Sequence, residues 1–299
     1  MNWDDLRIFL AVARTGGLLS AARKLDVDHT TVARRLTSLE AAIGAQLIDR
    51  SPRGARLTDA GSALLEHAER IETETLAAAE RLRGADERAS GVVRLATPEA
   101  FGAWMVTPAL PRLQALHPGI ELELVPQPHN VNLTKREADL AVTLARPPKG
   151  RLYAQKLTNY HLGLYASEQH LERLGPIASL AELQARPMVG YIEEMIDVPE
   201  LRALGDFGGR PAFRSSSIVA QQIAVASGVG VGLLHVFAAE QVAGLKRVLA
   251  DEVEIERSYW LAVHADQRHL PRVRAVIDFL HDIVAESRAA FVKRQIDAS

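Results

Sequence analysis

The chain has 299 residues, of which 47% are hydrophobic and 24% are charged, and its formal net charge at pH 7 is −2. This length suits two or three compact domains, and the near-neutral charge gives no overall basic bias toward nucleic acid. The absence of cysteine excludes disulfides, cysteine-ligated zinc and thiol catalysis. The chain starts with the acidic stretch MNWDD, which lacks the basic segment of a signal peptide, and no apolar run is long enough to span a bilayer, so we expect a cytoplasmic protein.

Residues 3–58 carry the pattern of three short helices followed by a hairpin. Apolar residues recur at helical spacing, and Gly16 and Gly44 mark the ends of the first and third helices. Two short extended pieces then flank the turn at residues 51–54. This order of elements predicts a winged helix-turn-helix in residues 1–58.

The third helix begins with small polar side chains and arginine. Asp28 is a suitable N-cap, and the residues after it can lie on the outer face near the start of the helix. In helix-turn-helix docking, this part of the second helix of the motif contacts base edges in the major groove, where arginine bonds guanine bidentately and threonine offers a hydroxyl and a methyl group. An ordinary solvated helix with a charged face is the alternative.

Local charge supports the DNA-binding interpretation. Residues 1–58 hold nine Lys and Arg against six Asp and Glu, whereas residues 59–90 hold four against eight. Arginines of the hairpin are suited to phosphates beside the groove. The predicted DNA contacts are His29, Thr30, Thr31, Arg34 and Arg35 in the helix, and Arg50, Arg53 and Arg56 in the hairpin.

Residues 59–88 form one long helical pattern with a narrow apolar stripe. A helix of this length cannot bury its stripe on a small neighbour alone, so we expect it to pair with its own copy. The alternative is a helix that lies on the following domain. The predicted pairing face consists of Leu64, Ala68, Ile71, Thr75, Ala79 and Leu82.

From residue 91 onward, strand-like and helical segments alternate, which indicates parallel βαβ units. The strands are too many for one simple sheet, and two small α/β lobes joined near residues 145–162 and 264–270 fit better. The predicted lobes are residues 91–161 with 265–299, and residues 162–264. The cleft between two such lobes is a common place for a small ligand.

The chain resembles the LysR-type transcriptional regulators. The resemblance rests on the stretch LRIFLAVARTGGLLSAARKLDVDHTTVARRLTSLEAAIGAQLIDR and on the later RLTDAG, where this family enters its linker helix. His29 stands where many members carry glutamine, and Asp28 where serine is common, so the operator sequence cannot be transferred from a relative. The rest of the chain resembles, more loosely, a two-lobed effector domain of the periplasmic-binding-protein type.

The resemblance implies an α/β protein with a winged helix-turn-helix, a long linker helix and a two-lobed effector domain. It implies sequence-specific binding of double-stranded promoter DNA, modulated by a small-molecule effector held between the lobes. The expected assembly is a homodimer through the linker helix and a dimer of dimers, or homotetramer. RNA polymerase is a further expected partner, whereas a membrane partner, a cofactor, a metal and enzyme activity are not expected.

The effector site is expected where strands end and helices begin. Thr97 follows the first strand of the domain and matches a position that in relatives is usually serine or threonine and touches the ligand; the alternative is that it only caps the next helix. Glu99 and Glu193, which also belong to the predicted site, would repel an anion unless they face away or pair with Arg146. The predicted effector contacts are Thr97, Glu99, Gln127, Arg146, Tyr191, Ile192 and Glu193.

Two other functions compete with this interpretation. A two-lobed solute-binding protein or enzyme without a DNA-binding role would require secretion or a catalytic set, and neither is visible in the sequence. A constitutive architectural DNA binder with an empty pocket is the third possibility. The glycines from Gly228 to Gly232 precede a strand rather than follow one, so they predict a tight turn and not a phosphate loop.

Overall fold

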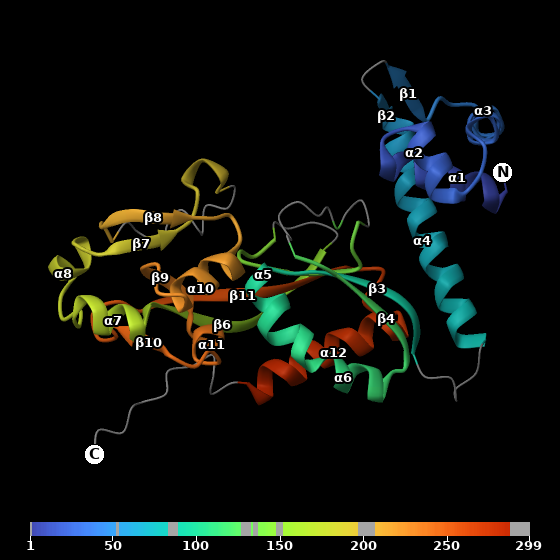
Figure 1. Cartoon of the computed structure of the whole chain (residues 1–299). Helices are drawn as coiled ribbons and strands as arrows, with labels where there is room; N and C mark the ends of the chain where they lie inside the picture. Colours follow the sequence, from blue (N-terminus) through green and yellow to red (C-terminus); the bar gives the residue numbers. More distant parts are fainter. Residues whose placement is uncertain are drawn as a thin grey trace.

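The computed structural model describes residues 2–51, 54–82, 89–126, 133, 137–147, 152–196 and 207–287 (Figure 1). The N-terminal head consists of α1 (Trp3–Thr15), α2 (Leu18–Leu25) and α3 (His29–Ile43), followed by the antiparallel hairpin of β1 (Ile48–Ser51) and β2 (Gly54–Leu57). Its core is made by the apolar faces of all three helices and of the hairpin, and includes the fully buried Phe9, Val12 and Leu36. The predicted winged helix-turn-helix is therefore the observed fold of the head.

Glu40 near the end of α3, together with Thr58 and Gly61 beyond the hairpin, fixes the hairpin to the helices. One carboxylate oxygen of Glu40 accepts hydrogen bonds from the backbone N–H groups of Leu47, at 2.9 Å, and Ile48, at 3.2 Å. The Thr58 hydroxyl accepts the backbone N–H of Gly61 at 3.0 Å, at the start of the long helix α4 (Asp59–Leu82). A Cβ at Gly61 would lie 2.0 Å from the Leu47 carbonyl oxygen, so only glycine fits this close approach.

An ion pair joins α4 to the end of α1. The Arg14 guanidinium donates to both carboxylate oxygens of Glu72, at 3.2 and 2.5 Å, and lies 3.9 Å from Glu69. Ala68 is fully buried in the core of its own head. This burial corrects the predicted pairing face, because a residue enclosed by its own chain cannot contact a partner. Leu64 is half-buried and also packs against the head.

The rest of α4 lies free of the C-terminal domain. Figure 1 shows the helix leaving the head and standing clear of the large sheet, so the alternative in which α4 lies on the following domain does not describe this structure. Ile71 is 41% exposed, and Thr75, one turn further on, is exposed as well. The side chains of Ala79 and Leu82 lie outside the described part of the chain. An uncovered apolar side chain on a long helix is consistent with pairing between copies.

In its described residues, the C-terminal domain is built on one nine-stranded sheet with the strand order β4-β3-β5-β11-β6-β9-β7-β8, and β10 pairs with β6. Parallel pairs occur on both sides, as the βαβ pattern predicts, but the central strands are antiparallel. The strands are β3 (Ser90–Ala96), β4 (Gly119–Val125), β5 (Leu140–Thr143), β6 (Leu152–Ser167), β7 (Pro187–Gly190), β8 (Arg210–Arg214), β9 (Val231–His235), β10 (Leu245–Val248) and β11 (Ile255–His264).

Helices cover this sheet in two groups, one for each lobe (Figure 1). Lobe 1 carries α5 (Glu99–Phe101), a π-helical turn η1 (Gly102–Val106), α6 (Thr107–Leu116) and α12 (Pro271–Glu286). Lobe 2 carries α7 (Glu168–Leu174), α8 (Leu180–Gln184), a 3-10 turn η4 (Glu193–Met195), α10 (Ile218–Ala226) and α11 (Val236–Ala239).

The two lobes are connected by strands rather than by loops. β6 is 16 residues long; its beginning pairs with the end of β11, and its last part pairs with β9 and β10 of lobe 2. The Trp260–Val263 part of β11 also pairs with β5 of lobe 1. The predicted connection near residues 145–162 is thus largely strand, and the proposed boundary at residue 264 falls after a stretch that belongs to the sheet of lobe 1.

None of the helices in the described ranges combines the length and the apolar character that crossing a membrane would require.

Candidate nucleic-acid interface and effector site

The start of α3 presents its polar side chains to solvent. His29, Thr30 and Arg34 are exposed, with 64% of the His29 side chain accessible, and Thr31 is half-buried. The inner face of the same helix is fully buried through Val32 and Leu36. The helix therefore separates an outward polar face from an apolar core face, which is the arrangement that reading the major groove requires.

Asp28 is the N-cap of this helix, as the sequence predicts. One of its carboxylate oxygens accepts the backbone N–H of Thr30 at 2.7 Å and the Thr30 hydroxyl at 2.6 Å. The hydroxyl bond, followed by the backbone bond, holds the pKa of Asp28 below its usual value. Because the Thr30 hydroxyl hydrogen is directed to the cap, this residue offers a base edge its oxygen lone pairs and its methyl group rather than a donor.

The predicted DNA-contact arginines have different surroundings. Arg34 is exposed, whereas the Arg35 guanidinium lies 3.3 Å from Asp5 and 3.8 Å from Asp4 of α1. Arg35 thus has a structural partner within the head that the sequence pattern did not indicate. In the hairpin, Arg56 is exposed on β2, while Arg53 and the side chain of Arg50 lie outside the described part of the chain.

Thr97 lies at the junction of β3 and α5 and is fully buried. Its hydroxyl oxygen has no hydrogen-bond partner among the described residues. The helix that follows contains the π-helical turn η1, whose wide backbone is bridged by the Thr107 hydroxyl donating to the Gly102 carbonyl at 2.9 Å. Single π-turns inside helices are frequent at functional sites. The structure thus places Thr97 beside an irregular helix start, with its polar group unsatisfied.

Gly102 is expected to be needed for this arrangement. A Cβ there would lie 2.6 Å from the Thr97 hydroxyl oxygen and 3.2 Å from the Leu124 side chain. We expect Gly102→Ala to lower the free energy of unfolding by about 1–3 kcal/mol, as overpacking in a dense core does. In a Thr97→Ala background the same substitution should cost less, because the clashing oxygen is gone. Urea unfolding of the four proteins measures this, and an equal cost in both backgrounds would contradict it.

Glu99 connects the two lobes. Its carboxylate accepts a hydrogen bond from the Ser217 hydroxyl at 2.8 Å and one from the backbone N–H of Ile218 at 2.8 Å. Ser217 is the N-cap of α10, and its hydroxyl oxygen accepts the backbone N–H of Ala220 at 3.2 Å. Ser217 therefore caps the start of α10 with its side chain. The contact with Glu99 was not predicted.

The other predicted effector contacts are distributed around the ends of β5 and β7. Arg146 is exposed, and its guanidinium carbon lies 5.5 Å from the centre of the Trp260 ring. Ile192 is half-buried and Glu193 is exposed, with its carboxylate 3.3 Å from the Arg214 guanidinium. Each glutamate therefore pairs with a group other than Arg146, the partner that the sequence suggested. Gln127 lies outside the described residues.

Aromatic side chains fill the region where the lobes meet. The Tyr160 ring on β6 stacks on Tyr259 of β11, with ring centres 4.1 Å apart, and on His235 at the end of β9, 5.2 Å apart. Phe101 of α5 meets the edge of Tyr259 at 5.0 Å. The Tyr259 hydroxyl and His235 Nδ1 are buried without a hydrogen-bond partner among the described residues. Burial raises the pKa of Tyr191, and the charge of Glu99 raises it further.

Acid should destabilise this cluster through His235. Burial lowers the pKa of His235 to about 3 from the usual 6.5, so the unfolded chain binds a proton below pH 6.5 that the folded protein does not bind until about pH 3. Stability is thus complete above pH 6.5 and decreases as the pH falls from 6.5 toward 3. At pH 5 the loss through this one group is about 2 kcal/mol.

The test compares the wild type with His235→Phe by urea unfolding at pH 7 and pH 5. The phenyl ring can keep the stacking on Tyr160, so the variant should lose about 2 kcal/mol less than the wild type over this range. His269→Ala, at an exposed position, should lose as much as the wild type. An unchanged loss in His235→Phe would show that this imidazole is not the acid-sensitive group.

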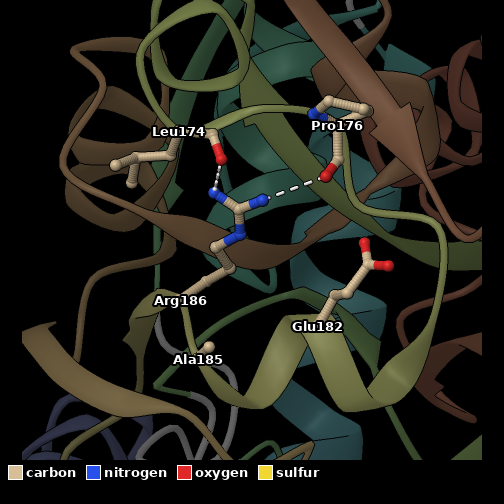
Figure 2. Close-up of a pocket in the computed structure, with 5 residues that line it drawn as sticks. All are labelled: Leu174, Pro176, Glu182, Ala185 and Arg186. Carbon is tan, nitrogen blue, oxygen red and sulfur yellow. Dashed lines mark hydrogen bonds between the residues drawn. The ribbon is translucent and has the colours of Figure 1, made fainter.

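A separate cavity of about 470 Å³ lies on lobe 2, between the ends of α7 and α8 (Figure 2). Its lining residues are Leu174, Pro176, Glu182, Ala185 and Arg186. The Arg186 guanidinium donates to the carbonyl oxygens of Leu174, Gly175 and Pro176, the last two at 3.1 and 2.9 Å. These hydrogen bonds hold the loop at residues 174–176 and occupy the arginine. The cavity therefore has few free polar groups with which to bind a ligand.

Comparison with known protein families assigns both parts of the chain. Residues 3–62 match the model of the bacterial regulatory helix-turn-helix protein, lysR family, and residues 86–285 match the LysR substrate binding domain. Among curated relatives, the Mau operon transcriptional activator of Paracoccus denitrificans is 29% identical over 291 residues, which cover 97% of this chain and 99% of the relative. The regulator CrgA of Neisseria meningitidis serogroup C is 27% identical, with 93% and 96% coverage.

Solved structures agree with this assignment. CrgA, a LysR-type transcriptional regulator from Neisseria meningitidis, superposes with a TM-score of 0.59 at 25% identity and covers 94% of this chain and 98% of that one. ArgP from Mycobacterium tuberculosis gives a TM-score of 0.68 at 20% identity, with 94% and 96% coverage, and supports the fold. The exposed polar start of α3, the two-lobed domain and these matches lead to one conclusion: the chain belongs to the LysR family of transcriptional regulators, with a helix-turn-helix DNA-binding domain and an effector-binding domain.

Proposed function

We propose that this regulator reads its promoter site through the start of α3, with His29, Thr30, Thr31 and Arg34 at the base edges. The observation that carries the proposal is the exposure of His29, Thr30 and Arg34 on a helix whose other face forms the core of the head. Arg50, Arg53 and Arg56 of the hairpin are proposed phosphate contacts. Arg35 is also proposed to contact DNA, and to do so it would have to give up its ion pair with Asp5.

The effector is proposed to bind between the lobes, near Thr97, Glu99 and Tyr191. The unpartnered buried hydroxyl of Thr97 and the π-turn beside it support this position. Gln127, Arg146, Ile192 and Glu193 are proposed at the rim of the same cleft. The effector must bind one arrangement of the lobes better than the other, because a ligand with equal affinity for both would not switch anything.

The assembly is proposed to be a dimer through α4 and a dimer of such dimers, acting in the cytoplasm and in contact with RNA polymerase. Ile71 and Thr75 supply the exposed part of the pairing face, and Leu64 contributes at its edge, since it is half-buried. Ala79 and Leu82 would extend the same face. A dimer places two α3 helices on one duplex, so the promoter site is expected to be partly palindromic.

Genomic footprinting of the purified protein tests the DNA-binding part. We expect a small set of protected promoter sites with related half-sites, and the genes beside them would indicate the metabolites to try as effectors. An effector found in this way should raise the melting temperature of the wild type but not of Thr97→Val, whose promoter affinity should be unchanged. Uniform protection without preferred sites would instead favour the constitutive architectural binder.

A further inference from the structure

Glu99 makes the two side-chain hydrogen bonds that connect α5 of lobe 1 with α10 of lobe 2. Both of its carboxylate oxygens are used, one by the Ser217 hydroxyl and the other by the Ile218 backbone N–H, and both distances are 2.8 Å. The partners are 118 and 119 residues away in sequence. The contact is therefore a tertiary connection across the two lobes and not a local helix cap.

The position that Glu99 fills is suited to an anion. The backbone N–H groups at the N-terminus of a helix and the helix dipole both stabilise negative charge, and α10 spans nine residues. A carboxylate that accepts one hydroxyl and one backbone N–H there makes two charge-assisted hydrogen bonds. A small carboxylate ligand entering the cleft would seek the same donors.

The buried polar groups without a partner in this region of the domain are neutral. The Thr97 hydroxyl, the Tyr259 hydroxyl and His235 Nδ1 are buried and have no partner among the described residues. Burial keeps the pKa of His235 near 3, so the imidazole carries no positive charge at neutral pH. Burial, and after it the charge of Glu99, raises the pKa of Tyr191, so this hydroxyl stays a phenol and can donate. Arg146 is cationic but exposed, and its guanidinium lies beside the Trp260 ring. No contact within the described residues joins it to Glu99.

We propose that Glu99 is an internal carboxylate ligand that occupies the anion site of α10, ties the two lobes together and thereby selects against carboxylate effectors. The effector of this protein is then a neutral polar or cationic compound, recognised by the hydroxyl and ring nitrogen groups of the cleft and by its aromatic side chains. An anionic effector would have to expel a tethered carboxylate and then lie beside its charge. This inference rests on the proposed effector cleft and specifies the chemistry of its ligand.

The test uses the full-length chain with Glu99→Ala, Glu99→Gln and the control Glu193→Ala. Glu193 is a second glutamate near the cleft, but it is exposed and pairs with Arg214 instead of α10. We expect the melting temperature of Glu99→Ala to fall by about 4 °C or more, that of Glu99→Gln to fall less, and that of Glu193→Ala to stay within about 1 °C of the wild type. Sodium acetate, at an ionic strength held constant with sodium chloride, should then restore Glu99→Ala selectively.

Selective recovery of Glu99→Ala by acetate would show that a free carboxylate can replace the side chain at α10. The proposal is overturned if Glu99→Ala melts like Glu193→Ala, or if acetate stabilises the wild type as much as the variant. If Glu99→Ala does not fold, Glu99→Gln decides: a melting temperature equal to that of the wild type overturns the proposal, and a lower one that acetate does not change supports it. Promoter binding by the same proteins is measured separately, so a failure of DNA recognition is distinguishable from a failure of the Glu99 assignment.

Discussion

Arg34→Ala is expected to weaken binding to the promoter site by at least about 30-fold while leaving the fold intact. A bidentate arginine–guanine contact contributes about 1–3 kcal/mol of discrimination, and a dimer loses it in both half-sites. Arg34 is exposed and forms no ion pair with another residue in the described part of the chain, so its removal should not disturb the head. The effect should be largest on the cognate sequence, because non-specific binding depends on phosphate contacts.

Two variants make this prediction specific. Arg34→Lys keeps the charge but loses the planar fork, so it should bind non-specific DNA like the wild type and still lose most of its sequence preference. Arg56→Ala, in the hairpin, should weaken binding to all sequences alike and lower the salt dependence by about one counterion. Mobility-shift titrations on a promoter fragment and a scrambled fragment, at two salt concentrations, measure these effects. An unchanged promoter footprint for Arg34→Ala would refute the assignment of α3 as the recognition helix.

Ile71→Glu is expected to dissociate the dimer. Burying an isoleucine side chain contributes about 1.5–3 kcal/mol, and a two-fold interface loses this twice and places two like charges near each other. We therefore expect the dimer dissociation constant to rise by about 100-fold or more. Promoter affinity should fall with it, since two linked heads bind adjacent half-sites far better than separate ones do.

Sedimentation velocity over a range of protein concentrations measures the assembly directly. Ile71→Leu is the matched control, because it keeps an apolar side chain of the same volume and should remain a dimer. Circular dichroism should show the same helix content for both variants, because Ile71 is 41% exposed and lies outside the core of the head. If Ile71→Glu sediments like the wild type, α4 does not pair through this face.

The head could be predicted almost completely from sequence because its determinants are local. Asp28 indicates the start of α3, Gly44 indicates its end, and the spacing of apolar residues between them identifies the inner face. Such signals involve residues within one or two helical turns of each other, so they can be recognised in a short stretch of sequence. The partner of Arg35 was missed because Asp5 is 30 residues away on another helix. Ala68 was assigned to a partner chain because apolar spacing does not say which neighbour covers it.

The effector domain was predictable only in outline. Alternating strands and helices indicated βαβ units, but β6 serves both lobes along its 16 residues, and no composition change marks the crossing. The same limit applies to the site. Thr97 could be found from its place after a strand, whereas the contact of Glu99 with Ser217 depends on how two lobes close on each other. The aromatic contacts of Tyr160, His235 and Tyr259 arise from three separate strands and have no common sequence signal.

The ion pair between Arg14 and Glu72 has a mechanical consequence. It fastens the head to the middle of α4, so we expect the head and the 24-residue helix to move as one rigid unit. That helix is about 36 Å long, and a tilt of about 10° at its far end would displace the recognition helix by about 6 Å, nearly two base-pair steps. In the proposed dimer, a small reorientation beneath α4 would thus change the spacing of the two heads along the duplex.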